Sequence, residues 1–160
     1  MNAPLNKRIQ QIIVNMERSR WVDSDPTGDY LVVNIPQFKL LVFEHDSLVW
    51  TSNVVVGKEA HKTAIFQGEI NNIVFSPYWN VPPGIQKNEI MPAIKRNPNY
   101  LAQHNMEWNG NQVRQKPGPG NALGKVKFLF PNSFSMYLHD TPSKSLFQED
   151  KRAFSHGCIR

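Results

Sequence analysis

The stretch Ser155-His156-Gly157-Cys158-Ile159-Arg160 decides how the fold and the rest of the chain are interpreted, because it holds the only cysteine of the sequence. A thiol with an imidazole two positions before it and a guanidinium two positions after it contains the parts of a nucleophilic site. A cysteine attacks as the thiolate and therefore needs a base or a positive neighbour near neutral pH. His139 offers a second imidazole, at the end of an alternating run over residues 134–138 that predicts a strand. Two histidines and one arginine are thus candidates for activating Cys158.

Several alternatives compete at these residues. In an extended segment, residues two apart share a face, so geometry alone favours His156 as the base of Cys158. A lone cysteine is by default a buried core residue. His139, His156 and Cys158 could instead be three zinc ligands, although their spacing matches no common zinc signature. In a papain-like protease the cysteine precedes the histidine, which is the opposite order.

Composition indicates one folded domain with an anionic partner. The chain has 160 residues, of which 40% are hydrophobic and 11% aromatic, enough for a single domain with a real core. The formal net charge is +5, so nucleic acid and the anionic bacterial cell wall are both candidate partners. Because the lysines and arginines are scattered rather than arranged in a stripe, we do not expect nucleic acid. No stretch approaches the roughly twenty apolar residues of a membrane span.

The pattern of apolar residues changes along the chain. Leu5, Ile9, Ile12, Ile13 and Met16 recur at helical spacing, so residues 1–24 predict an amphipathic helix packed on the domain, in preference to a helix at a membrane surface. An acidic, turn-rich segment at residues 23–29 ends it. Beyond it the period becomes two, and the strands we expect are residues 30–35, 39–44, 48–56, 63–66, 72–76, 125–130 and 135–139.

Residues 84–121 interrupt this β pattern. Their first half is helical in character despite Pro92, and residues 105–115 are polar around Trp108. An interruption of this length in a β domain is usually a functional lid or a small subdomain. We therefore expect a mainly β sandwich or barrel-like domain at residues 25–160 with an inserted helical subdomain.

Several stretches together carry a family resemblance. They are His139 followed by Ser155–Arg160, and also residues 32–36, 54–57, 78–83 and 117–124, whose letters are VVNIP, VVVG, YWNVPP and PGPGNALG. The chain resembles the L,D-transpeptidases of the YkuD-type fold, and is most similar to the large periplasmic branch with a capping subdomain. The resemblance implies that residues 84–121 are the cap, that the chain is truncated at its C-terminus, and that the protein acts in the periplasm or cell envelope. Residues 1–20 lack the apolar core of a signal peptide.

The resemblance also assigns the proton transfers. It implies that His139, and not His156, is the base and acid that serves Cys158, and that the backbone carbonyl of Asp140 orients its other ring nitrogen. His156 is then a positioning residue. This arrangement replaces the carboxylate of a serine-protease triad with a peptide oxygen.

The remaining site residues are expected to bind substrate. The Gly157 and Cys158 amides could stabilise an oxyanion. Arg160 shares a face with Cys158 and could pair with a substrate carboxylate, with a surface ion pair as the alternative. Tyr137, Trp79 and Ser155 are expected to line the cleft, although the two aromatic residues could equally belong to the core.

The activity that the resemblance implies is L,D-transpeptidation of peptidoglycan by a monomer that needs no metal or organic cofactor. The Cys158 thiolate would attack the diaminopimelate carbonyl of a tetrapeptide stem, release D-alanine and pass the acyl group to an acceptor amine. The resemblance also implies acylation by carbapenems. Two alternatives remain: an L,D-carboxypeptidase that gives the acyl group to water, and an inactive wall-binding domain.

Overall fold

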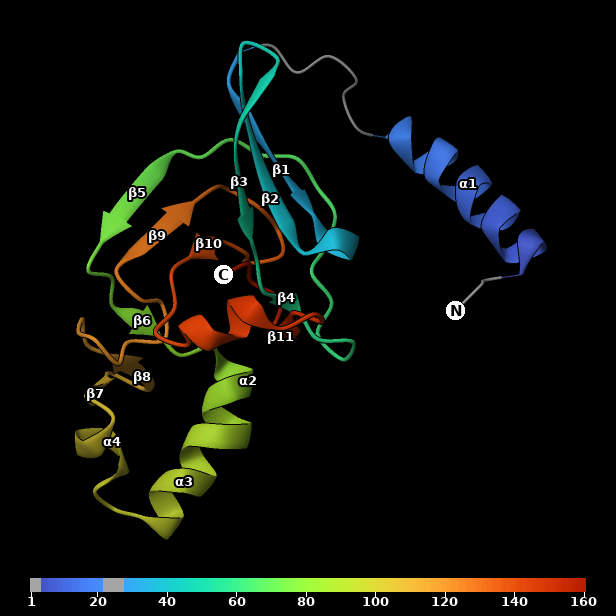
Figure 1. Ribbon diagram of the computed structural model, residues 1–160. Coiled ribbons are helices and arrows are strands. Elements are labelled where there is room, and N and C mark those ends of the chain that lie inside the picture. Colours follow the sequence, from blue (N-terminus) through green and yellow to red (C-terminus); the bar gives the residue numbers. More distant parts are fainter. Residues whose placement is uncertain (1–3, 22–27) are drawn as a thin grey trace. The chain divides into compact units, whose positions relative to one another are not determined.

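A computed structural model describes residues 4–21 and 28–160 of the chain (Figure 1). The chain divides into two compact units, one formed by residues 1–34 and 39–52 and the other by residues 35–38 and 53–160. Most of the acidic turn expected at residues 23–29 lies outside the described residues.

The predicted N-terminal helix is present as α1 (Leu5–Ser19), which follows Pro4. The Arg20 and Trp21 amides bond back to Glu17 and Arg18, which closes its last turn. The apolar residues of α1 are all exposed, from 46% at Val14 to 75% at Leu5. The helix is therefore confirmed, and its packing on the domain stays a prediction. None of the helices that the structure describes is long and apolar enough to span a bilayer.

The first unit also contains a three-stranded sheet in the order β1-β2-β3, formed by β1 (Tyr30–Asn34), β2 (Lys39–Glu44) and β3 (Ser47–Asn53). β1 and β2 are antiparallel, and their register stacks the Tyr30 and Phe43 rings with centroids 4.8 Å apart. His45 and Asp46 have φ of 48° and 60°, the left-handed pair that a two-residue hairpin turn requires. The period-two prediction is confirmed here, except that the third strand ends at Asn53 rather than at Val56.

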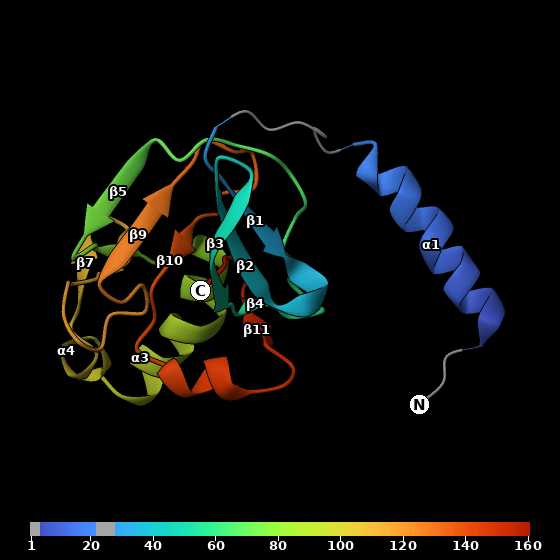
Figure 2. The ribbon, with the colours of Figure 1, turned by 45° about the horizontal axis from the view of Figure 1, so that its top comes forward.

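The second unit contains three sheets, the third of which lies at the insertion. β5 (Asn72–Phe75), β9 (Val126–Leu129) and β10 (Leu138–His139) form an antiparallel sheet in the order β10-β9-β5, and its strands lie side by side in Figures 1 and 2. β4 (Val56–Gly57) pairs in parallel with β11 (Ala153–Ser155), which follows the 3-10 turn η3 (Lys144–Gln148). A further 3-10 turn, η1 (Ile35–Gln37), belongs to this unit.

The last residues of the chain join these two sheets. The His139 amide donates to the Ile159 carbonyl at 3.0 Å, and the Ile159 amide donates to the Tyr137 carbonyl at 3.3 Å. On the other side, Arg160 and Val55 exchange two backbone hydrogen bonds of 2.9 Å. Ile159 and Val55 are buried. The residues that follow Cys158 are thus held by the backbone on both sides, and that pairing fixes the position of the nucleophile candidate.

Two of the strand predictions differ from the structure. Residues 63–66 form no strand, because the hydroxyl of Thr63 bonds to the backbone of Gly57 and Gly157, and Phe66 packs on aromatic rings instead of entering a sheet. The strand expected from residue 135 begins only at Leu138. The Asn132 side chain bonds to four backbone groups in residues 130–136 and holds a turn in which Ser135 has a φ of 54°.

The insertion contains the predicted helix and also a hairpin that the sequence analysis missed. The helix runs without a break through α2 (Pro83–Ile85), the π-helical turn η2 (Gln86–Ile90) and α3 (Met91–Arg96). Pro92 cannot donate a hydrogen bond and would crowd the carbonyl four residues before it. The wider π turn, in which the Met91 amide bonds to Gln86, relieves that crowding.

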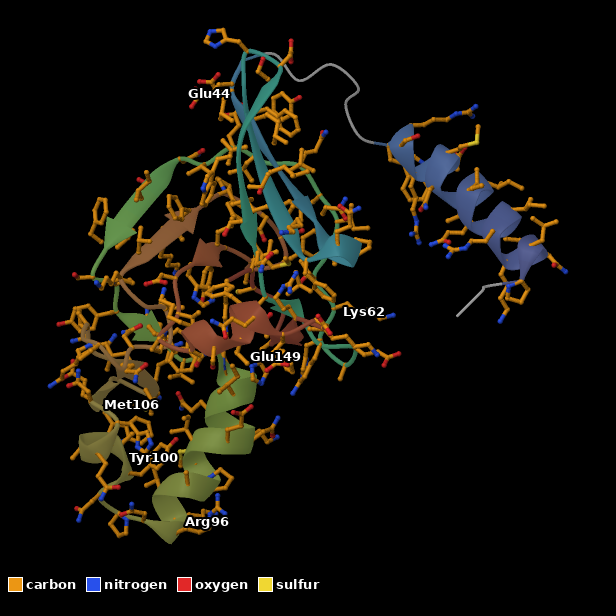
Figure 3. All side chains as sticks on the ribbon, viewed as in Figure 1. Glu44, Lys62, Arg96, Tyr100, Met106 and Glu149 are labelled. Carbon is orange, nitrogen blue, oxygen red and sulfur yellow. The ribbon has the colours of Figure 1, made fainter. Side chains whose placement is uncertain are left out.

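After α4 (Tyr100–Gln103), β7 (Met106–Asn109) and β8 (Gln112–Gln115) form the hairpin, and β6 (Trp79–Asn80) extends it into a sheet of order β6-β8-β7. The buried core between this sheet and the inserted helix consists of Val81, Ile90 and Val113. Tyr100 and Met106 pack against this core (Figure 3). The insertion therefore has a small hydrophobic core of its own.

Candidate active site

Strand pairing brings the predicted site residues to one face. Leu138 and Ile159 are paired in parallel, so Tyr137 and His139 on one strand lie on the same face as Cys158 and Arg160 on the other. In the neighbouring antiparallel pair, Lys127 lies directly opposite His139. We call these five residues the catalytic face. Sequence reasoning predicted four of them, and missed Lys127 because the register between β9 and β10 cannot be deduced from the sequence.

His139 is buried and has a defined tautomer. Its Nδ1 lies 2.5 Å from the Asp140 carbonyl oxygen, and because a carbonyl can only accept, Nδ1 must carry the proton. Nε2 is then the free basic nitrogen. Burial lowers the pKa of His139 to about 4; the Asp140 carbonyl opposes this, and the Arg160 and Lys127 cations add to it. His139 is therefore neutral at pH 7, as a general base must be.

Cys158 is half-buried and is protonated at rest. Burial raises the pKa of its thiol, whereas hydrogen bonds from the Tyr137 amide and hydroxyl, and the charges of Lys127 and Arg160, lower it. Because burial dominates, the neighbouring cations do not produce a thiolate by themselves. The thiol needs a base when it attacks, and the neutral imidazole on the same face can serve as one.

Tyr137 is influenced by both Cys158 and Trp79. Burial raises the pKa of Tyr137, so its phenol stays neutral; Cys158 adds to this rise and Trp79 opposes it. Lys127 Nζ lies 3.9 Å from the centroid of the Tyr137 ring. Tyr137 and Trp79 therefore lie near Cys158, and their contact with substrate stays a prediction.

Arg160 has an unused donor in this face. Burial lowers the pKa of Arg160, opposed by the charges of Cys158 and Tyr137. Within residues 4–21 and 28–160, its Nε is one of two buried side-chain nitrogens without a hydrogen-bond partner, the other being Arg152 Nε. A buried guanidinium nitrogen without a partner costs free energy, and a carboxylate placed there would supply one.

The turn before Cys158 is held by Ser155. The Ser155 hydroxyl donates to the Cys158 carbonyl at 2.5 Å and accepts from the Gly157 amide at 3.1 Å. Ser155 is 1% exposed and holds the nucleophile turn, and its predicted contact with substrate stays a prediction. Because the Gly157 amide is already bonded to Ser155, only the Cys158 amide of the predicted oxyanion pair stays available in this state.

His156 and Cys158 flank Gly157 in the nucleophile turn, and both line one cavity. Gly157 has a φ of +117°, so this segment is not a regular extended strand. His156 Nε2 lies 3.0 Å from Glu89 Oε1 in η2 of the insertion. This contact links the nucleophile turn to the inserted helix and supports the prediction that His156 is a positioning residue. Glu89 was missed because only the fold brings it to this turn.

A cavity of about 260 Å³ lies beside the thiol and is lined by Cys158, Gly157, His61 and Met136, among others. The loop at residues 61–63 is held close to the nucleophile turn, since Thr63 Oγ1 donates to the Gly157 carbonyl at 2.9 Å. A Cβ at Gly57 would lie 2.0 Å from the His61 carbonyl oxygen, so only glycine fits there. Among the residues that the structure describes, no three His, Cys, Asp or Glu side chains gather into a metal-binding group.

The fold is mainly β and presents a cysteine, a buried histidine and an arginine on one face. The model of the YkuD family, the L,D-transpeptidase catalytic domain, matches residues 28–160. The chain belongs to this family, which is cysteine-dependent and generally associated with the cell envelope.

Two known proteins are similar to the chain. A Haemophilus influenzae protein named "Putative L,D-transpeptidase" is 33% identical over 172 aligned residues, which cover 94% of this chain and 35% of that protein. The chain thus spans about a third of that relative's length. The crystal structure of a Brucella melitensis protein described as a probable carnitine operon oxidoreductase, caia, matches with a TM-score of 0.50 and 16% identity, over 76% of this chain and 67% of the other. At that identity the likeness concerns the fold alone.

Proposed function

We propose that this protein is a peptidoglycan L,D-transpeptidase that forms an acyl-enzyme at Cys158. The observation that carries the proposal is the hydrogen bond of 2.5 Å between His139 Nδ1 and the Asp140 carbonyl, which leaves Nε2 as a neutral base on the face that holds Cys158. Membership of the family supports peptidoglycan as the substrate.

In the first half of the reaction, His139 Nε2 takes the proton of the Cys158 thiol as the sulfur attacks the diaminopimelate carbonyl of a tetrapeptide stem. The tetrahedral intermediate collapses when the bond to D-alanine breaks, and His139 returns the proton to the departing amine. The Cys158 amide is a donor for the developing oxyanion. The products are a thioester on Cys158 and free D-alanine.

In the second half, the amine of a neighbouring stem attacks the thioester carbonyl and loses a proton to His139. The bond to sulfur breaks, and the proton returns to the thiolate. The result is a diaminopimelate to diaminopimelate cross-link and a restored thiol. Dividing the transfer into two steps around a covalent intermediate is the advantage of nucleophilic catalysis.

The cationic groups of the catalytic face indicate how the donor is oriented. Arg160 Nε is buried without a partner, and Lys127 lies opposite His139. A stem peptide carries carboxylates, and a guanidinium binds a carboxylate with defined geometry. In this proposal Arg160 binds a carboxylate of the donor stem, while Tyr137 and Trp79 form the wall beside it.

The test is incubation of the protein with purified disaccharide-tetrapeptide, followed by chromatography of the products and measurement of free D-alanine. We expect release of D-alanine together with cross-linked dimer from the parent chain, and neither product from Cys158→Ser. Tripeptide without dimer would instead identify an L,D-carboxypeptidase. Wall binding without release of D-alanine would identify an inactive binding domain.

The proposal has three corollaries. The protein acts in the periplasm or cell envelope, where its substrate lies. It acts as a monomer, which size-exclusion chromatography with light scattering tests. Carbapenems, which resemble the donor, acylate Cys158. The adduct can be detected as a mass increase of the intact protein.

A further inference from the structure

A second concave surface lies entirely within the insertion. It is a groove of about 860 Å³ between the inserted helix and the β7–β8 hairpin, and its lining includes Lys87, Met91, Lys95, Trp108, Asn109 and Asn111. Its volume is in the range of ordinary ligand sites. None of these residues belongs to the catalytic face or to the turn that holds Cys158.

Side-chain hydrogen bonds hold the two walls of the groove in place. Gln86 bridges helix and hairpin: its Nε2 donates to the Asn111 carbonyl at 3.0 Å, and its Oε1 accepts from the Val113 amide at 2.8 Å. Gln112 Nε2 donates to the Val81 carbonyl at 3.0 Å. Val81 and Val113 belong to the buried core beneath it. The two walls are therefore fixed to each other, as a preformed site requires.

The groups that face the groove have a consistent chemistry. Lys87 and Lys95 form no ion pair within the described part of the chain, and the lining contains no Asp or Glu. Trp108 is 48% exposed in an otherwise folded hairpin. An open indole stacks on flat apolar faces such as that of a pyranose ring, and the free ammonium groups attract carboxylates. Asn109 and Asn111 add amides that can bond to hydroxyl or acetamido groups.

We propose that this groove binds the glycan part of peptidoglycan, with Trp108 stacked on a sugar ring and with Lys87 and Lys95 paired with carboxylates of the attached stem peptide. The inference rests on the proposed function for the choice of polymer, and on charge complementarity and the exposed indole for the choice of surface. It makes the insertion a substrate-holding surface separate from the residues that carry out the transfer.

The test is calorimetric titration of the Cys158→Ser chain with soluble disaccharide-tetrapeptide and, separately, with the same tetrapeptide lacking sugar. We expect Trp108→Ala to raise the Kd of the disaccharide-tetrapeptide about tenfold or more and to leave the Kd of the free tetrapeptide within about twofold. Lys87→Gln combined with Lys95→Gln should weaken disaccharide-tetrapeptide binding and flatten its dependence on salt.

Matched controls are Phe75→Ala, which removes an exposed aromatic ring on β5, and Lys151→Gln, which removes an exposed lysine outside the groove. Both should bind like the Cys158→Ser parent. The inference is overturned if that parent does not bind the disaccharide-tetrapeptide, if Trp108→Ala binds it equally well, or if the controls lose as much affinity. Because binding is measured without turnover, failure of the transpeptidase proposal would appear separately, as absent release of D-alanine by the chain with Cys158.

Discussion

The catalytic face and the groove of the insertion hold their charged groups in opposite ways. On the catalytic face, burial is the largest influence on the pKa of Cys158, His139 and Lys127, and strand pairing on both sides fixes their positions. In the groove, Lys87 and Lys95 form no ion pair and line an open surface beside Trp108. Burial sets the pKa values on the catalytic face, whereas the exposed side chains of the groove are free to bind a ligand. The pair of His156 and Glu89 links the nucleophile turn to the inserted helix.

The largest effect is expected from the histidines of the catalytic face and its turn. His139→Ala removes the base and should slow acylation of Cys158 by about 10² to 10⁴-fold. His156→Ala should slow it much less, because His156 acts through the turn. The measurement is the rate of thioester formation by intact-protein mass spectrometry. Equal acylation rates in His139→Ala and the parent would show that His139 is not the base.

Burial of His139 also predicts how stability depends on pH. Its pKa is about 4 in the folded protein against 6.5 in the unfolded chain, so the unfolded state binds the proton first as the pH falls. The stability that depends on neutral His139 is fully present above pH 6.5 and is lost as the pH falls towards 4, by about 3 kcal/mol in all.

Urea unfolding at several pH values between 7 and 4 measures this change, with His139→Gln as the comparison. The variant should lack that share of the pH dependence and keep the part that comes from carboxylates. If the parent and the variant lose stability in parallel, His139 is not buried in its neutral form.

Replacement of Lys127 should have a smaller effect, which is a change in the pKa of the Cys158 thiol. Its charge lowers the pKa of Cys158, so Lys127→Gln should raise that pKa and move the rise in iodoacetamide labelling to higher pH. Lys151→Gln is the control for loss of a lysine elsewhere. A shift to lower pH would mean that Lys127 does not act on the thiol through its charge.

The smallest effect is expected at the contact between the nucleophile turn and the inserted helix. Glu89 and His156 are partly exposed, with side-chain exposures of 53% and 35%, and such pairs contribute about 1 kcal/mol or less. Glu89→Gln should therefore slow acylation about two- to fivefold. A double-mutant cycle with His156→Gln measures the coupling. Additive effects of the two substitutions would show that the contact does not position the turn.

The residues that could be predicted from the sequence are those whose pattern is local. The alternation of apolar and polar residues predicted β1, β2, β5 and β9, and apolar residues at helical spacing predicted α1 and the inserted helix. The β7–β8 hairpin was missed although its two-residue loop, Gly110-Asn111, is a turn signal and Gly110 has a φ of +61°. Its strands are mostly polar, and Val113 is their one buried hydrophobic residue.

Features that depend on distant pairing could not be predicted. Lys127 reaches the site through the β9–β10 register, and Glu89 reaches His156 through a contact 67 residues apart in the chain. The choice between His139 and His156 came from the family resemblance, since local geometry favoured His156. Gly157, with its positive φ, breaks the extended segment on which the local argument rested.

Acylation of Cys158 can be tested by intact-protein mass spectrometry after incubation with a carbapenem, on the parent chain, Cys158→Ser and His139→Ala. We expect a mass increase of one drug molecule on the parent, none on Cys158→Ser and a much slower increase on His139→Ala. No adduct on a parent chain shown by circular dichroism to be folded, or an adduct that persists in Cys158→Ser, would contradict this expectation.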